Sequence, residues 1–162
     1  MRYGAGTYGQ IVPLTATAHS TGETFRTDIL IDGHHQLVTD EPASVGGTDT
    51  GPAPHELFPA MLAACIVTTV RAYARTKGWP LGELSVDVVY DNKSTPRHFD
   101  VTLHLPDDLT EEQRRRLDRV AKACPVRRAI EAGFEFDEHF AGHAPYGSRD
   151  ERRPISDSAA KY

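Results

Sequence analysis

The chain has 162 residues, a length that suits one domain with a sizeable hydrophobic core. Hydrophobic residues make up 39% and charged residues 25%, as in ordinary soluble globular proteins. The net charge of −5 argues against a dominant nucleic-acid role, because a phosphate-binding face needs clustered Lys and Arg. The one basic cluster, Arg114 to Arg116, is flanked by acidic residues and is expected to be a solvated helix face.

Three further features bear on the cellular compartment. No apolar run approaches the length needed to cross a bilayer, and the first ten residues lack the apolar core of a signal peptide. Two cysteines are too few for the disulfide framework of a secreted domain. We therefore expect a cytoplasmic protein that binds neither nucleic acid nor membrane.

The first third of the chain predicts a three-stranded meander. Residues 1–11 are Gly-rich and are expected to form a flexible arm. Residues 14–33 alternate loosely around a turn at 20–23, which predicts two strands, and a third strand is expected after the turn at Asp32 and Gly33. His34 and His35 flank that turn, and a surface pair is favoured over a metal site because no second ligand cluster has matching spacing.

A Gly- and Pro-rich loop, "DEPASVGGTDTGPAP", leads into the longest predicted helix. Its glycines are followed by neither GK[ST] nor GxGxxG, so they are expected to shape the chain beside a pocket rather than to bind phosphate. The helix is expected from Pro54 to about Lys77, with Pro59 either delaying its start or bending it. One helical stripe is expected to face inward: Leu57, Met61, Cys65, Thr68 and Ala72.

The second half predicts two strands, two helices and a closing strand. The strands are expected over 84–90 and 97–105, where apolar and polar residues alternate. A helix is expected from Thr110, which has Gln113 at capping-box spacing, and a short helix between Pro125 and Gly133. Residues 134–140 are expected to close a sheet, and the polar residues 141–162 to form a flexible tail. This order indicates an α+β fold.

The two cysteines, Cys65 and Cys124, are too far apart for a CxxC redox motif or a clustered zinc site. A buried cysteine can pack simply as a small hydrophobe. Cys124, however, directly precedes Pro125 at a predicted helix start, where unpaired N–H groups favour a thiolate, with Arg127 and Arg128 one turn away. Cys65 follows His55 and Glu56, groups that can tune a thiol or carry a proton. Inert packing and reactive chemistry both remain open on these grounds.

The loop, the segment "HELFPAMLAAC" and the later "CPVRRAI" together resemble the OsmC/Ohr family of osmotically induced and organic-hydroperoxide-resistance proteins. The resemblance covers residues 12–140 as one OsmC-like domain. It implies an α+β fold with antiparallel sheets wrapped around central helices, in an intertwined homodimer.

The resemblance also implies a chemistry. Cys65 matches the peroxidatic cysteine, which becomes a sulfenic acid, and Cys124 matches the resolving cysteine, which forms a disulfide with it. The implied partners are an organic hydroperoxide and a dithiol reductant, and neither metal nor flavin is required. Leu57, Phe58, Met61 and Leu62 are expected to line a pocket for the organic part of the substrate.

The chain departs from the family pattern at the groups expected around Cys65. Hydroperoxidases of the family place a carboxylate ten residues before the first cysteine, where this chain has His55; Glu56 follows one residue later. On a continuous helix Glu56 would point away from Cys65, unless Pro59 bends the helix. The family's N-terminal arginine is best matched by Arg26, for which an exposed strand position is the alternative. Arg127 stands where many relatives have histidine.

Two alternatives to the peroxidase follow. The displaced carboxylate suits an OsmC-like stress-linked binding protein or redox sensor with little turnover. Two inert cysteines in the core of an unrelated fold are the other possibility.

Overall fold

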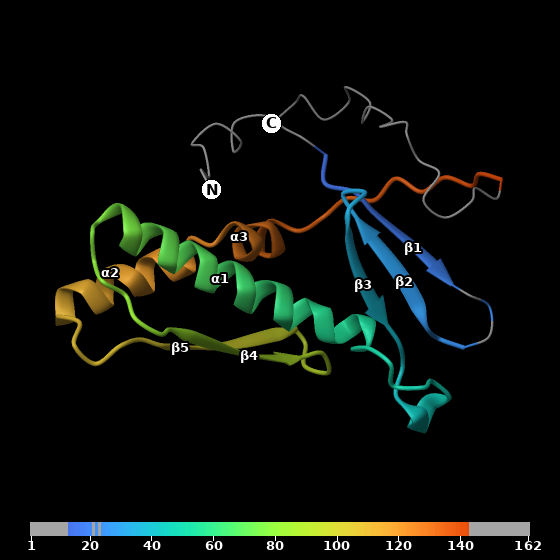
Figure 1. Ribbon diagram of the computed structural model, residues 1–162, viewed down its shortest axis with the longest axis horizontal. Coiled ribbons are helices and arrows are strands. Elements are labelled where there is room, and N and C mark those ends of the chain that lie inside the picture. The colour runs from blue at the N-terminus through green and yellow to red at the C-terminus, as the bar shows by residue number, and fades with distance from the viewer. Residues whose placement is uncertain (1–12, 21, 23, 143–162) are drawn as a thin grey trace. The chain divides into compact units, whose positions relative to one another are not determined.

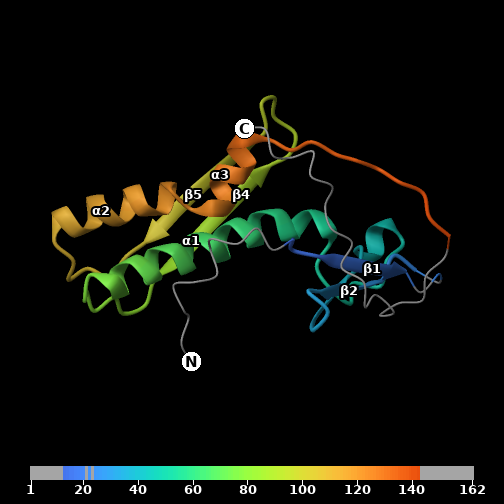
Figure 2. The same ribbon diagram turned by 90° about the horizontal axis from the view of Figure 1, so that it is seen from above.

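The computed structural model describes residues 13–20, 22 and 24–142, which form two compact units. The first contains the described residues up to Ala53 together with 140–142, and the second spans Pro54–His139. The predicted arm 1–11, and all of the predicted tail except residues 141 and 142, lie outside the described residues. Figures 1 and 2 show the elements of both units.

The first unit contains the predicted meander. Its strands are β1 (Ala16–Ser20), β2 (Thr27–Ile31) and β3 (His35–Thr39), which pair antiparallel in chain order. The β2–β3 turn passes through Asp32 and Gly33 with φ angles of 48° and 73°, the left-handed conformation that Asp and Gly tolerate best. The prediction of three strands around these turns is confirmed.

The loop after β3 contains a 3₁₀ turn, η1 (Ala43–Val45), and is held close to the strand by two glycines. A Cβ at Gly47 would overlap the carbonyl of Glu41, and one at Gly51 would lie 2.5 Å from the carbonyl oxygen of Val38. Backbone approaches this close exclude any side chain at either position. Gly47 and Gly51 therefore shape the chain, as expected, whereas their place beside a pocket stays a prediction.

The second unit begins with a 3₁₀ turn, η2 (Pro54–Glu56), followed by the long helix α1 (Leu57–Thr76). Pro59 is the third residue of α1, within the first turn, where a missing N–H leaves no intrahelical bond unmade. Of the two expectations for Pro59, the delayed start is the one observed.

A hairpin and two shorter helices complete the second unit. The hairpin consists of β4 (Ser85–Asp91) and β5 (His98–His104), and the helices are α2 (Glu111–Lys122) and α3 (Pro125–Ala132). α1 packs along β4 and α2, and the start of α3 also reaches it (Figures 1 and 2). These elements are those expected from the sequence, including the capping box between Thr110 and Gln113.

The buried face of α1 differs from the expected stripe. Leu62, Ile66, Val70 and Ala74 are at most 2% exposed and form the core with Leu117 of α2 and its neighbours. Of the predicted stripe, Leu57 and Cys65 are half-buried, whereas three residues are exposed: Met61, Thr68 and Ala72. The prediction was wrong because α1 carries apolar residues on several sides, so periodicity alone does not select the face that packs on the hairpin.

Two further expectations are corrected: that no apolar run approaches the length needed to cross a bilayer, and that residues 134–140 form a closing strand. Pro54–Thr76 is 23 residues long and contains an 18-residue window with a mean hydropathy of 1.5, so by length and composition it could cross a membrane; the core helix of a soluble protein meets the same criterion. Residues 134–140 form no strand: Phe134, Phe136 and Phe140 are exposed, and no described strand pairs with them. Alternation supplies the pattern of a strand, but a strand also needs an edge to pair with.

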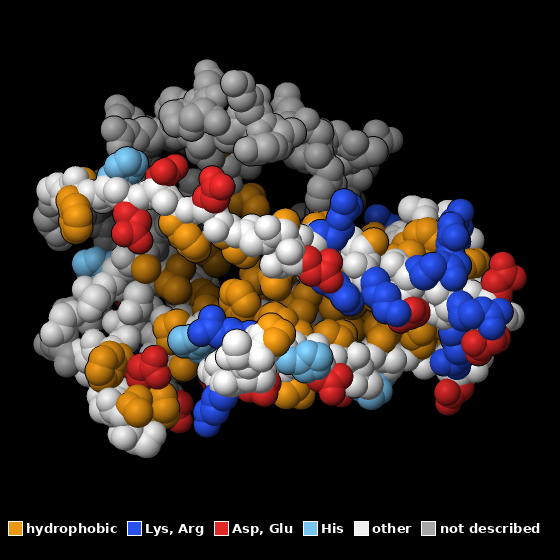
Figure 3. All heavy atoms as spheres, turned by 180° about the vertical axis from the view of Figure 1, so that it is seen from behind, with side chains coloured by type: hydrophobic (Ala, Val, Ile, Leu, Met, Phe, Trp, Pro, Cys, Tyr) orange, Lys and Arg blue, Asp and Glu red, His pale blue; other side chains and the backbone are white. Residues whose placement is uncertain are grey.

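Basic side chains gather over α2, at the right of Figure 3. Arg115 is paired with Glu111 at 3.4 Å and Lys122 with Asp118 at 2.7 Å, each one helical turn away. This agrees with the expected solvated helix face.

Candidate active site

The structure brings Cys65 and Cys124 together. Cys65 lies in the middle of α1 and is half-buried, with Thr69 Oγ1 4.0 Å from its sulfur. Cys124 is the residue that caps α3 and is fully buried. The Cys65 thiol lies close enough to Cys124 to shift its pKa, and both cysteines are free thiols. Pro125 starts α3 at Cys124 because its ring is preorganised for the first helical position, and this places the second thiol against α1.

The pKa of Cys124 is raised above its ordinary value of 9.0, mainly because burial disfavours the thiolate and further because of the contact with Cys65. The backbone N–H groups of Arg127 and Val126 act in the opposite direction but are outweighed. The expectation of a stabilised thiolate at Cys124 was therefore wrong. The N–H groups expected at the start of α3 are present. The Arg127 side chain, which was expected to act with them, is instead paired with Glu131 at 2.8 Å.

A cavity of about 380 Å³ lies within the second unit. Its apolar wall consists of Leu62, Phe99, Val101 and Ile130, and its polar groups are those of His98, Arg127 and Glu131. Leu62 lies one helical turn before Cys65, and Arg127 three residues after Cys124. Of the four residues expected to line a pocket, Leu62 is the one that lines this cavity; the ring of Phe58 packs 5.7 Å from that of Phe99.

Of the charged groups expected around Cys65, Glu56 and His55 belong to the second unit and Arg26 to the first. Glu56 is exposed and ends η2, and with helical backbone angles it directly precedes α1; His55 is exposed beside it. Arg26 belongs to the first unit, where its Nη2 lies 2.9 Å from Asp28 Oδ1 and its Nη1 donates to Thr50 Oγ1 at 3.4 Å. The roles assigned to Glu56 and Arg26 stay predictions.

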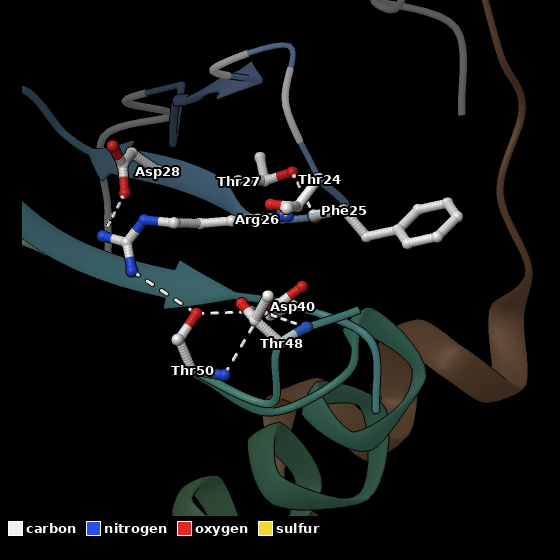
Figure 4. A network of polar contacts seen from close by, with 8 residues as sticks. All are labelled: Thr24, Phe25, Arg26, Thr27, Asp28, Asp40, Thr48 and Thr50. Atoms are coloured by element: carbon white, nitrogen blue, oxygen red, sulfur yellow. Dashed lines mark hydrogen bonds and ion pairs between the residues drawn. The ribbon is translucent and has the colours of Figure 1, made fainter. Parts of the chain in front are cut away.

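Sequence reasoning missed Asp40, which is 1% exposed and organises the loop after β3 (Figure 4). Its Oδ2 accepts from the backbone N–H and hydroxyl of both Thr48 and Thr50, and its Oδ1 accepts from the backbone N–H of Glu41 at 2.8 Å. These bonds, led by that from the Thr48 hydroxyl, hold the pKa of Asp40 well below its usual range. The sequence feature that could have identified Asp40 is an Asp at a strand end followed by two threonines in the next loop.

Within residues 13–20, 22 and 24–142, no three His, Cys, Asp or Glu side chains lie close enough to hold a metal ion.

The model of the family described as OsmC-like protein matches residues 47–139, which include both cysteines. The chain belongs to this family. No curated protein matches it. The OsmC-like fold, with antiparallel sheets and helices, is confirmed by solved structures of relatives. An OsmC-like protein from Mycoplasma pneumoniae is 18% identical with a TM-score of 0.61, the match covering 75% of this chain and 89% of that one.

Two other OsmC-like structures have names that mention hydroperoxide resistance. An organic hydroperoxide resistance protein from Legionella pneumophila is 23% identical over 75% of this chain and 90% of that one, with a TM-score of 0.53. A protein from Vibrio cholerae assigned to organic hydroperoxide resistance, with captopril bound in one of its active sites, is 26% identical. That match covers 76% of this chain and 88% of the other, with a TM-score of 0.54.

Proposed function

We propose that this OsmC-like protein is a thiol-dependent peroxidase that reduces organic hydroperoxides. The observation that carries the proposal is the proximity of the Cys65 thiol of α1 to the Cys124 thiol at the start of α3. A peroxidase of this kind needs one reachable thiol and a second thiol close enough to trap its oxidised form. Cys65 is half-buried and Cys124 fully buried, which matches that division of labour.

The reaction proceeds in three steps. The thiolate of Cys65 attacks the terminal oxygen of ROOH; the O–O bond breaks, Cys65 becomes a sulfenic acid, and the alkoxide leaves as ROH after taking a proton. The thiol of Cys124 then attacks the sulfenic sulfur, forming the Cys65–Cys124 disulfide and releasing water. A dithiol reductant finally exchanges with this disulfide, regenerating both thiols and leaving as its own disulfide.

Other groups have supporting roles in this proposal. Arg26 stabilises the Cys65 thiolate, and Glu56 assists proton transfer, with His55 as the alternative at that step. The cavity accommodates the organic part of the peroxide, because its apolar wall is formed by Leu62, Phe99, Val101 and Ile130.

The protein is further proposed to act in the cytoplasm as an intertwined homodimer. Support comes from α1, where only 22% of the apolar window is fully buried within the single chain, because a helix that is apolar on several sides needs burial on several sides.

The test is consumption of cumene hydroperoxide with excess dithiol, comparing wild type with Cys65→Ser and Cys124→Ser. Sustained consumption by wild type, lost in Cys65→Ser, supports the peroxidase. In Cys124→Ser, one turnover followed by overoxidation of Cys65 is expected, read by mass spectrometry.

Two other outcomes contradict the proposal. Formation of the disulfide without sustained turnover indicates a redox sensor or binding protein. Thiols that persist after stoichiometric peroxide indicate inert packing.

A further inference from the structure

The hydroxyl of Thr50 connects a buried carboxylate to an arginine. Thr50 Oγ1 lies 2.9 Å from Asp40 Oδ2 and 3.4 Å from Arg26 Nη1 (Figure 4). The direction of these bonds is fixed by chemistry, because the ionised carboxylate of Asp40 only accepts and the guanidinium of Arg26 only donates. The single hydroxyl proton of Thr50 must therefore point to Asp40, which leaves an oxygen lone pair for Arg26.

The buried charge strengthens this arrangement. Asp40 is 1% exposed and keeps its negative charge, since four donor groups of Thr48 and Thr50 converge on its Oδ2. A hydroxyl that donates to a carboxylate becomes a better acceptor, because hydrogen bonds in a chain polarise one another.

The guanidinium group of Arg26 makes two polar contacts, one through each terminal nitrogen. Asp28 Oδ1 lies 2.9 Å from Nη2, and Thr50 Oγ1 accepts from Nη1. The ion pair alone leaves the guanidinium free to pivot, because both Arg26 and Asp28 are more than a third exposed and such pairs restrain a side chain weakly. A second contact, on a loop fixed by Asp40, defines the plane of the guanidinium.

We propose that Thr50 is a positioning residue for the peroxidase, orienting Arg26 through the Asp40–Thr50–Arg26 chain of hydrogen bonds. The inference rests on the proposed function, in which Arg26 stabilises the Cys65 thiolate. In this proposal Thr50 acts on the reaction only through Arg26.

The chain supplies a matched control. Thr48 donates its hydroxyl to the same Asp40 oxygen at 2.6 Å, a shorter bond than that of Thr50. No hydrogen bond joins Thr48 to Arg26 within the described part of the chain. Thr48→Val therefore removes an Asp40 bond at least as strong, whereas Thr50→Val also removes the contact with Arg26.

The experiment measures kcat/KM for cumene hydroperoxide and the pH profile of Cys65 alkylation in six proteins. These are wild type, Thr50→Val, Thr50→Ser, Thr48→Val, Arg26→Met and the double variant of Thr50→Val with Arg26→Met. We expect Thr50→Val to lower kcat/KM about tenfold, the effect of losing one hydrogen bond to a charged group, and to move the alkylation profile to higher pH. Thr50→Ser should restore both, and Thr48→Val should change kcat/KM less than threefold at matched thermal stability.

The double variant separates positioning from loop stability. If Thr50 acts through Arg26, Thr50→Val should have no further effect once Arg26 is replaced. Equal losses in Thr48→Val and Thr50→Val, or additive losses in the double variant, overturn the positioning role while the peroxidase stands. An Arg26→Met variant with wild-type kinetics also overturns it. Wild type that consumes no peroxide instead refutes the proposed function, an outcome read before any Thr50 variant is compared.

Discussion

At the scale of single residues, the two thiols differ in access to solvent. Cys124 is fully buried with a raised pKa, whereas Cys65 is half-buried. Since the thiolate is the species that reacts with iodoacetamide, we expect Cys124 in the reduced protein to be alkylated at least about tenfold more slowly than Cys65 at pH 8. Peptide mass spectrometry over time measures both rates, with unfolded protein as the control for equal reactivity. Faster alkylation of Cys124 would contradict the assignment of Cys65 as the attacking thiol.

Asp40 gives a second residue-scale prediction. Its pKa in the folded protein lies below the ordinary value of 3.8, so its ionised network stabilises the fold above pH 3.8, and this contribution is lost as the pH falls toward the folded-state pKa. We expect Asp40→Asn to unfold at a lower denaturant concentration than wild type at pH 7, and the difference to shrink below pH 3.8. Chemical unfolding at several pH values measures this. A difference that is independent of pH would show that the carboxylate charge does not stabilise the loop.

The residues of the candidate site were predictable to different extents. Both cysteines stand out because thiols are few and their sequence contexts are unusual. Asp40 was missed because its importance comes from donors eight and ten residues away, which meet it only after the loop has folded. The ionisation of Cys124 was predicted in the wrong direction, since a helix start is visible in the sequence and burial is not.

At the scale of elements, α2 has a complete capping box. Thr110 Oγ1 accepts from the Gln113 N–H at 3.2 Å, and the Gln113 side chain accepts from the Thr110 N–H at 2.8 Å. Thr110→Ala should therefore lower the free energy of unfolding by about 1 kcal/mol, while Thr110→Ser should be near neutral. Urea unfolding followed by circular dichroism tests both. If Ala and Ser are equivalent at this position, the cap does not contribute to stability.

Element boundaries were predicted well where local chemistry determines them. Capping residues, turn glycines and Pro125 act within a few positions, so the strands and helices from β1 to α3 follow from the sequence. Residues 134–140 show the limit of this approach. Their alternating phenylalanines suit a strand, but strand formation depends on a pairing edge that lies elsewhere and cannot be read locally.

At the scale of the whole molecule, the two faces of α1 differ in burial. Its Leu62–Ile66–Val70–Ala74 face is buried within one chain, while another face carries exposed small residues at four-residue intervals: Ala60, Ala64, Thr68 and Ala72. Small residues at this spacing allow a second helix to approach closely. The uncovered face also explains why the stripe predicted from the sequence was wrong, because α1 has apolar or small residues on both faces.

Ala64→Arg tests the proposed homodimer. If this face packs against a second copy, a long charged side chain in its middle should weaken dimerisation at least about a hundredfold, since one unpaired buried charge costs several kcal/mol. Val89→Arg is the matched control, because Val89 is apolar and 66% exposed on β4. Sedimentation velocity at micromolar concentration should show dimers for wild type and Val89→Arg, and monomers for Ala64→Arg. A wild-type monomer would refute the homodimer. If Ala64→Arg remains dimeric, the dimer interface does not involve this face of α1.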